Sequence, residues 1–127
     1  MSTQVFRTGS IGSVIFRMKR WFYARYYTPC KQYGKGEIAE RNKEIWTKMM
    51  SLVAERIKNI AEEGSDVALK ITLEHEDNIV GYAVGKNSEP VSILEFNPRK
   101  IKIVVYKRVQ EFEIPLSQEV KASVEGS

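Results

Sequence analysis

The sequence predicts a single α+β domain: a short N-terminal strand, two long helices, and then a four-stranded antiparallel meander with the helices packed on one face. Two observations carry this prediction. Apolar residues between positions 11 and 63 recur at three- and four-residue spacing, which is typical of helices. From position 66 onward they alternate with polar residues, which is typical of half-buried strands. Strands that follow helices in a run favour an α+β fold with the helices on one face of the sheet.

The first strand and the first helix are predicted from the opening third of the chain. Residues 4–8 (QVFRT) alternate in part and form the expected strand. A helix begins near residue 11, after turn and N-cap residues around Ser10, and its apolar stripe includes Val14, Met18 and Phe22. Pro29 is expected to end or kink this helix, because proline lacks a backbone donor and disfavours helical geometry at the preceding residue.

The second helix is expected over residues 37–63, where the apolar stripe is longest and Gly64 stands at the position of a C-terminal cap. Asp77-Asn78 and Asn97-Pro98 mark turns between the strands that follow. Short connections of this kind favour antiparallel neighbours. The four expected strands are residues 67–73, 79–84, 91–96 and 100–109, and residues 110–114 are an alternative extension of the last one.

Size and composition are those of one intracellular domain. The chain has 127 residues, of which 43% are apolar and 28% charged, a balance that argues against disorder. We assign residues 1–114 to a single domain and residues 115–127 to a polar, flexible tail. One cysteine, Cys30, excludes an internal disulfide framework. We see neither a signal peptide nor an apolar run of about 18 residues, so we expect a cytoplasmic protein with no membrane partner. Binding of a basic, aromatic helix over residues 11–28 to a membrane surface is a weaker alternative, because the other face of that helix is needed for the core.

Positive charge is concentrated at the N-terminus. Residues 1–36 hold seven Lys or Arg residues and no carboxylate, whereas the rest of the chain has a net negative charge. Within this region, residues 11–33 contain seven of the chain's thirteen aromatic residues. Single-stranded nucleic acid is bound by cations that follow the phosphates and by rings on which bases stack. The segment therefore predicts a surface that binds single-stranded DNA, with RNA as an alternative, and with little sequence preference.

Candidate binding residues lie on the helix face opposite the core stripe, in the loop after Pro29, and on one alternating face of the last strand. On a helical wheel the second face combines rings with cations only. The last strand offers lysine, tyrosine and arginine on one face, which suits either a base-stacking platform or a solvated face that guards a sheet edge. The candidate residues are Phe16, Arg17, Lys19, Arg20, Tyr23, Tyr27, Lys31, Tyr33, Lys35, Lys102, Tyr106 and Arg108.

Other interpretations of the same residues remain open at this point. Rings on both faces of the first helix also suit an interface between copies of the chain, because Tyr, Trp and Arg are enriched there. The protein would then be an assembly protein, with carboxylates of the second helix balancing the cations. Readout of duplex DNA is less favoured, because the basic face lacks the small and amide side chains of a recognition helix.

Catalysis and metal binding find little support in the sequence. One histidine, His75, and one cysteine cannot supply the ligands of a zinc site. A nucleophile–base pair of Cys30 and His75 would depend wholly on the fold, so we interpret them as an unremarkable thiol and a surface histidine. The glycines around Lys35 do not have the spacing of a phosphate-binding loop. We expect no enzyme activity and no cofactor.

Several motifs resemble the ThermoDBP-related proteins of hyperthermophilic archaea. They are the opening FRTGS at residues 6–10, the basic-aromatic RMKRWFYA at residues 17–24, GEIAERNKEIW at residues 36–46, SDVALKITLEHE, and the basic strand KIKIVVYKRV. The resemblance covers residues 5–109, and each motif is short. It implies single-stranded DNA binding, with RNA as an alternative, through a cleft with an apolar aromatic floor and a basic rim, and assembly into dimers or tetramers. This chain departs from the pattern in its ring-rich first helix with Pro29 and in the lack of a C-terminal leucine heptad.

Overall fold

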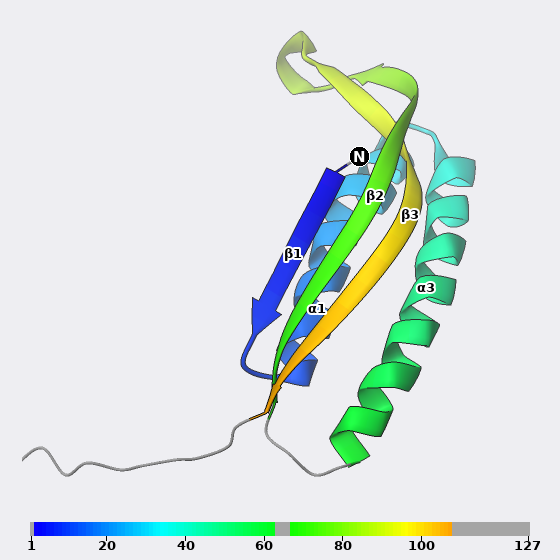
Figure 1. The fold of residues 1–127 in the computed structure, drawn as a ribbon. Coiled ribbons are helices and arrows are strands. Elements are labelled where there is room, and N and C mark those ends of the chain that lie inside the picture. Colours follow the sequence, from blue (N-terminus) through cyan, green and yellow to red (C-terminus); the bar gives the residue numbers. More distant parts are fainter. Residues whose placement is uncertain (1, 63–66, 108–127) are drawn as a thin grey trace, which may run out of the picture.

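In the part of the chain that the structure describes, the fold is α+β, with one antiparallel sheet of three strands and helices packed on it (Figure 1). A computed structural model describes residues 2–62 and 67–107. The elements are β1 (Ser2–Thr8), α1 (Ile11–Phe22), a π-helical segment (Tyr23–Tyr27), α2 (Thr28–Gln32), α3 (Gly36–Glu62), β2 (Val67–Val84), a 3₁₀ turn (Lys86–Ser88) and β3 (Pro90–Lys107). The N-terminal strand and the two long helical segments are confirmed. The four-stranded meander is wrong.

Two long strands replace the four short ones. β2 and β3 each have 18 residues and pair along their whole length, with β1 on the other edge of β2. Asp77-Asn78 and Asn97-Pro98 do not turn the chain. Asp77 and Asn78 pair with Phe96 and Glu95, and Asn97 and Pro98 pair with Glu76 and His75. Both pairs lie between two irregularities of the ladder, where the register shifts between Glu74 and His75 and again between Ile79 and Gly81. Bulges of this kind bend a strand without ending it, so turn-forming residues are accommodated inside long strands.

Pro29 does not end the helical region, but the helix changes its hydrogen-bonding pattern just before it. The five residues before α2 form the π-helical segment, and the N–H of Thr28 donates to the carbonyl of Tyr23. Pro29 then occupies the first turn of α2, where its missing N–H is tolerated. The chain thus stays helical from residue 11 to residue 32, and the π segment absorbs the disturbance.

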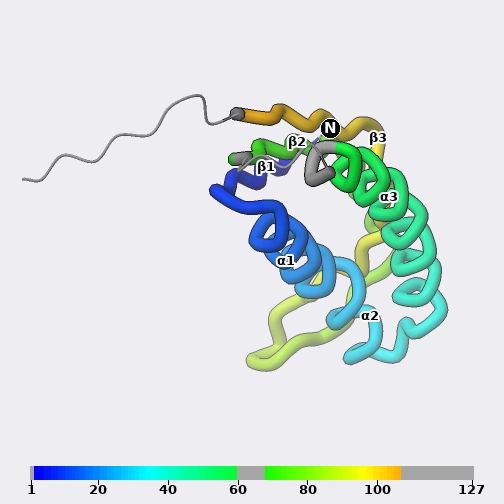
Figure 2. Tube along the Cα trace, turned by 90° about the horizontal axis from the view of Figure 1, so that it is seen from below, coloured from blue at the N-terminus to red at the C-terminus, as the bar shows by residue number. Residues whose placement is uncertain are grey.

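The helices lie on the same side of the strongly curved sheet, which is clear when the molecule is viewed along the strands (Figure 2). The core between them is built from β2 residues such as Leu69, Ile71 and Leu73, and from Met18 and Phe22 of α1, all of them buried. Phe22 stacks on Trp46 of α3 with ring centroids 4.5 Å apart. No helix among the described residues is both long and apolar enough to cross a bilayer.

The far end of the β2–β3 hairpin bends over the start of α3. Ile93 of β3 packs there against buried Cys30 and Ala39. The turn is tight at Gly85, where a Cβ atom would stand 2.8 Å from a methyl group of Val91, so only glycine fits. Asn87 follows with a φ of 65°, in the left-handed region that asparagine tolerates better than most residues.

Candidate nucleic-acid interface

The predicted helical residues form a continuous row along α1 and the segment after it. Phe16, Lys19 and Arg20 are exposed, whereas Tyr23 and Tyr27 are half-buried against the core. Each member has another member three or four residues away, so they are neighbours on the helix surface. We call this set of Phe16, Lys19, Arg20, Tyr23, Tyr27 and Lys31 the ring–cation row.

Cations lie over the rings throughout this row. The Arg20 guanidinium is 5.8 Å from the centroid of Phe16, and the Lys19 ammonium is 5.8 Å from that of Tyr23. Tyr27 has two ammonium groups at 5.7 Å, from Lys31 and from Lys43 of α3. At exposed sites such contacts stabilise by about 0.5–1 kcal/mol each. The row therefore holds its cations against ring faces by weak interactions.

One carboxylate enters the row, and it ties the row to α3. The Tyr27 hydroxyl donates to Oε1 of Glu40 at 3.0 Å, and Nζ of Lys31 lies 3.1 Å from the same oxygen. The hydrogen bond between Lys31 and Glu40 raises the pKa of Lys31 and lowers the pKa of Glu40. Within the described residues, neither Lys19 nor Arg20 has a carboxylate within ion-pair distance. The charge of the row is thus only partly balanced.

The remaining helix and loop candidates do not join the row. Arg17 lies on the β1 side of α1, where its Nη1 donates to the carbonyl of Arg7 at 3.0 Å. Tyr33 is half-buried below the hairpin, packed with the cluster of Cys30, Ala39 and Ile93. Lys35 is exposed in the loop after α2. Tyr33 is therefore a packing residue, and Lys35 is a separate surface charge.

The strand candidates lie on the sheet face that points away from the helices. Register places Arg7, Lys70 and Val104 side by side across the three strands, and places Lys102 beside Thr72 and Tyr106 beside Ala68. Tyr106 is 55% exposed. Together with Arg7 and Lys70 it lines a shallow hollow of about 370 Å³. We call this surface, with Arg7, Lys70, Lys102 and Tyr106, the outer sheet face. Arg108 lies outside the described residues.

Sequence reasoning missed Arg7 and Lys70 on this face. The alternation of each strand could have placed them, because Arg7 points to the same face of β1 as Val5, and Lys70 points to the same face of β2 as Thr72. The missing signal was the pairing of β1 with β2, which sets Arg7 opposite Lys70. The structure thus places six of the twelve predicted residues in the ring–cation row and two, Lys102 and Tyr106, on the outer sheet face. It brings these two strand residues together with two further cations, Arg7 and Lys70.

Beneath the row lies a polar network that contradicts the interpretation of His75 as a surface residue. His75 is only 3% exposed, and its ring meets Trp21 edge to face at a centroid distance of 5.3 Å. Its Nδ1 lies 2.8 Å from Oδ1 of Asp77, which also accepts a hydrogen bond of 2.6 Å from the Tyr26 hydroxyl. The Arg25 guanidinium pairs with Oδ2 of Asp77 at 2.9 Å. His75 was mistaken because its neighbours Glu74 and Glu76 are charged and the strand was expected to end before it. β2 instead continues, and His75 keeps the buried parity of Ile71 and Leu73.

Burial alone would raise the pKa of Asp77, but the hydrogen bonds from Tyr26, His75 and Arg25 outweigh it and lower the pKa. Burial and the hydrogen bond to this carboxylate raise the pKa of Tyr26 far above its ordinary value. Asp77 is therefore an ionised acceptor that fixes the π-helical segment to β2. Burial also raises the pKa of the Cys30 thiol, which disfavours its reactive thiolate form.

A second buried polar residue, Asn42 of α3, completes the support of the row. Its Nδ2 donates to the carbonyls of Tyr26 and Leu94, both at 2.9 Å, and its Oδ1 accepts from the N–H of Phe96 at 2.8 Å. Asn42 is fully buried, so these bonds satisfy backbone groups that water cannot reach. One side chain thereby joins the π-helical segment, α3 and the free edge of β3.

No group of three or more His, Cys, Asp or Glu side chains in the described part of the chain could hold a metal ion. Comparison with known protein families, with curated proteins and with solved structures finds no match. Function must therefore be argued from the two basic surfaces themselves.

Proposed function

We propose that this protein binds single-stranded nucleic acid, DNA or RNA, with little sequence preference, and that the ring–cation row is its main contact surface. The observation that carries the proposal is the stack of Arg20, Lys19 and Lys31 over Phe16, Tyr23 and Tyr27, with Glu40 as its one carboxylate. Such a row combines the two elements of non-specific single-strand binding, which are cations for phosphates and rings for bases.

A base that stacks on a ring of the row should be bound more strongly than the cation that lies over that ring. A stacked base contributes about 1–3 kcal/mol, against about 0.5–1 kcal/mol for an exposed cation over a ring. An arriving base can therefore displace a cation from a ring face, and the released cation can pair with the adjoining phosphate. Phe16 is the most accessible ring of the row, with 61% of its surface exposed. The outer sheet face would add charge and one further ring, Tyr106.

A direct test compares two variants that lose the same charge. Lys19→Gln/Arg20→Gln removes two cations from the row, whereas Lys48→Gln/Lys86→Gln removes two exposed cations elsewhere. We expect the first variant to bind labelled oligo-dT and oligo-rU at least about ten-fold more weakly, with a salt dependence reduced by about 1.4 in the log–log slope. An equal loss of affinity in both variants would mean that only net charge matters, and the row would not be the main contact surface.

Assembly into a homo-oligomer is the second candidate, and one observation favours it. The distal part of β2 exposes four large apolar side chains: Ile79 at 53%, Val80 at 45%, Tyr82 at 67% and Val84 at 75%. Contiguous apolar patches on a surface often mark protein interfaces. Light scattering during size-exclusion chromatography distinguishes the candidates, since an assembly protein would form a stable dimer or tetramer that Tyr82→Ser/Val84→Ser disrupts and that ignores oligonucleotides.

A further inference from the structure

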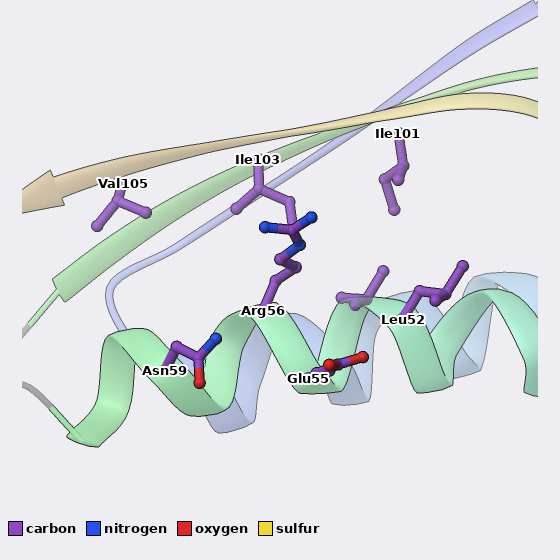
Figure 3. Close-up of a pocket in the computed structure, with 8 residues that line it drawn as sticks. Leu52, Glu55, Arg56, Asn59, Ile101, Ile103 and Val105 are labelled. Atoms are coloured by element: carbon purple, nitrogen blue, oxygen red, sulfur yellow. The ribbon is translucent and has the colours of Figure 1, made fainter.

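The two halves of α3 have different surroundings. The second half leaves a cleft of about 820 Å³ between itself and β3, in which the Arg56 side chain reaches from the helix toward Ile103 (Figure 3). The first half approaches the ring–cation row instead. Glu40 accepts a hydrogen bond from the Tyr27 hydroxyl, and the Lys43 ammonium lies over the ring of the same tyrosine. The first half of α3 therefore contributes charged groups to the row.

Glu40 brings one carboxylate into a group of donors at this end of the row. The Tyr27 hydroxyl and the Lys31 Nζ lie 3.0 Å and 3.1 Å from the same oxygen, Oε1 of Glu40. The hydrogen bonds from Lys31 and Tyr27 lower the pKa of Glu40, and the charge of Lys43 lowers it further. Among the described residues, no other carboxylate lies within ion-pair distance of either lysine. Two ammonium groups and one carboxylate leave this cluster with a net positive charge.

The same donors suit a phosphate group. Lysine and tyrosine side chains are among the groups that contact phosphate oxygens in nucleic-acid complexes, and an ionised carboxylate oxygen is an anionic acceptor of the same kind. We propose that the Tyr27 hydroxyl, Lys31 and Lys43 form a phosphate-binding position for one nucleotide of the bound strand, and that Glu40 occupies this position in the free protein. Given the proposed function, on which this assignment rests, Glu40 is a competitor that limits the affinity for nucleic acid.

Competition at this position requires that the Glu40 carboxylate can leave it. The side chains of Glu40 and Lys31 are 55% and 48% exposed, and ion pairs this exposed are weak because water and salt screen them. Other contacts hold α3 against the row, since Asn42 donates to the carbonyl of Tyr26 at 2.9 Å and Trp46 stacks on the first helix. A phosphate can therefore displace the Glu40 carboxylate while the helices stay in place.

A pair of variants of the full-length chain tests the assignment. Glu40→Gln removes the competing charge, and Glu44→Gln removes the same charge one turn further along α3, from an exposed pair with Lys48 at 3.4 Å. In fluorescence titrations with labelled oligo-dT, we expect Glu40→Gln to bind about four-fold more tightly than the unmodified chain, with a log–log salt slope steeper by as much as about 0.7, the value for one phosphate contact. Glu44→Gln should change the affinity by less than about two-fold, because its charge is screened from the row.

The possible results separate this assignment from the proposed function. Equal gains of affinity in the two variants, or no gain in Glu40→Gln, would overturn the phosphate-binding position, although the unmodified chain would still bind. Absence of binding by the unmodified chain at low salt would instead contradict the proposed function, and the phosphate-binding position with it.

Replacing Lys31 shows whether the gain comes from this lysine. The double variant Lys31→Gln/Glu40→Gln has the net charge of the unmodified chain, and we expect the two to bind with about the same affinity, because the released lysine is gone. In the unmodified chain, Lys31→Gln should weaken binding by less than about two-fold, because Glu40 already holds this lysine in an exposed pair. An equal loss of affinity on replacing Lys31 in both backgrounds would mean that the two side chains act independently, and it would overturn the assignment.

Discussion

The ring–cation row and the outer sheet face are both basic and aromatic, but they differ in how far their side chains already contact one another. In the row every ring has a cation over it, and Tyr27 and Lys31 share Glu40. On the outer sheet face Lys70 and Lys102 stand beside a single exposed ring, Tyr106, and no described cation lies over it. On the first surface the rings and cations already contact one another, and the second is a diffuse positive charge.

The difference has a cause in the secondary structure. Helical spacing of four residues brings a cation to the ring one turn away, and the π-helical segment keeps Tyr23 and Tyr27 in contact at a centroid distance of 4.9 Å. A strand spreads alternate side chains about 7 Å apart on an open face. Stacking should therefore depend on the row, and long-range attraction on both surfaces.

Removing the support of the row should have the largest effect. Asn42→Ala leaves the carbonyls of Tyr26 and Leu94 and the N–H of Phe96 buried without their partner. Because an unsatisfied buried group costs about 1–3 kcal/mol, we expect the free energy of unfolding in urea to fall by about 3–5 kcal/mol. Asn59→Ala, an exposed asparagine of the same helix, should change it by less than about 0.5 kcal/mol. A loss below about 1 kcal/mol for Asn42→Ala would mean that water replaces these bonds.

Removing the exposed ring of the row should weaken binding next in order. Phe16→Ala is expected to lower the affinity for oligo-dT by about ten-fold, within the range of about 1–3 kcal/mol for one stacked base. The log–log salt slope should stay the same, since no charge is lost. Val5→Ala, which shortens an exposed apolar side chain on the outer sheet face, is the control and should bind normally. Unchanged affinity of Phe16→Ala would assign stacking to another ring.

Removing a charge from the outer sheet face should change the salt dependence of binding more than the affinity. We expect Lys102→Gln to reduce the salt slope by about 0.7, the value for one phosphate contact on a single strand, with only a few-fold loss of affinity. Lys48→Gln, on the exposed side of α3 and paired with Glu44, serves as the control. A slope that does not change in Lys102→Gln would remove this face from the binding surface.

Acidification should weaken the hydrogen bonds and the ion pair that link the π-helical segment to β2 through Asp77. Of the four predictions, this one should have the smallest effect. The folded-state pKa of Asp77 is lower than its ordinary value, so its ionised form stabilises the fold above about pH 4, the range in which an unfolded aspartate ionises. That contribution is lost as the pH falls further. Asp77→Asn should reduce stability at neutral pH, and the difference from the unmodified chain should shrink on acidification in unfolding experiments. A constant difference down to about pH 3 would contradict this role.

Periodicity predicted the helices because their core contacts recur along one element. The expected helix over residues 37–63 corresponds to Gly36–Glu62, and Val14, Met18 and Phe22 of the expected stripe are all fully buried. The bounds of the strands were harder to predict, because Asp77-Asn78 and Asn97-Pro98 are residue pairs that commonly form turns. Here Asp77 is held inside a strand by Tyr26, His75 and Arg25, contacts that no local pattern reports.

The candidate site was predictable to a similar degree. Helical spacing identified the row, with Phe16, Lys19 and Arg20 exposed as expected. It could not reveal that Tyr27 and Lys31 share Glu40, or that Tyr33 packs below the hairpin, because both depend on how α3 and the hairpin meet the first helix. Likewise, the four-residue spacing that aligns rings with cations says nothing about Arg7 and Lys70, whose common face arises from strand pairing.

The central claim is that the chain binds single strands through cations and rings together. Its most direct test is a fluorescence titration of the unmodified chain with labelled oligo-dT and oligo-rU between about 50 and about 200 mM salt. We expect saturable binding to both, an affinity that falls as salt rises, and a residual affinity from stacking that Phe16→Ala lowers. Absence of binding at the lowest salt, or binding that does not depend on salt, would contradict the proposed function.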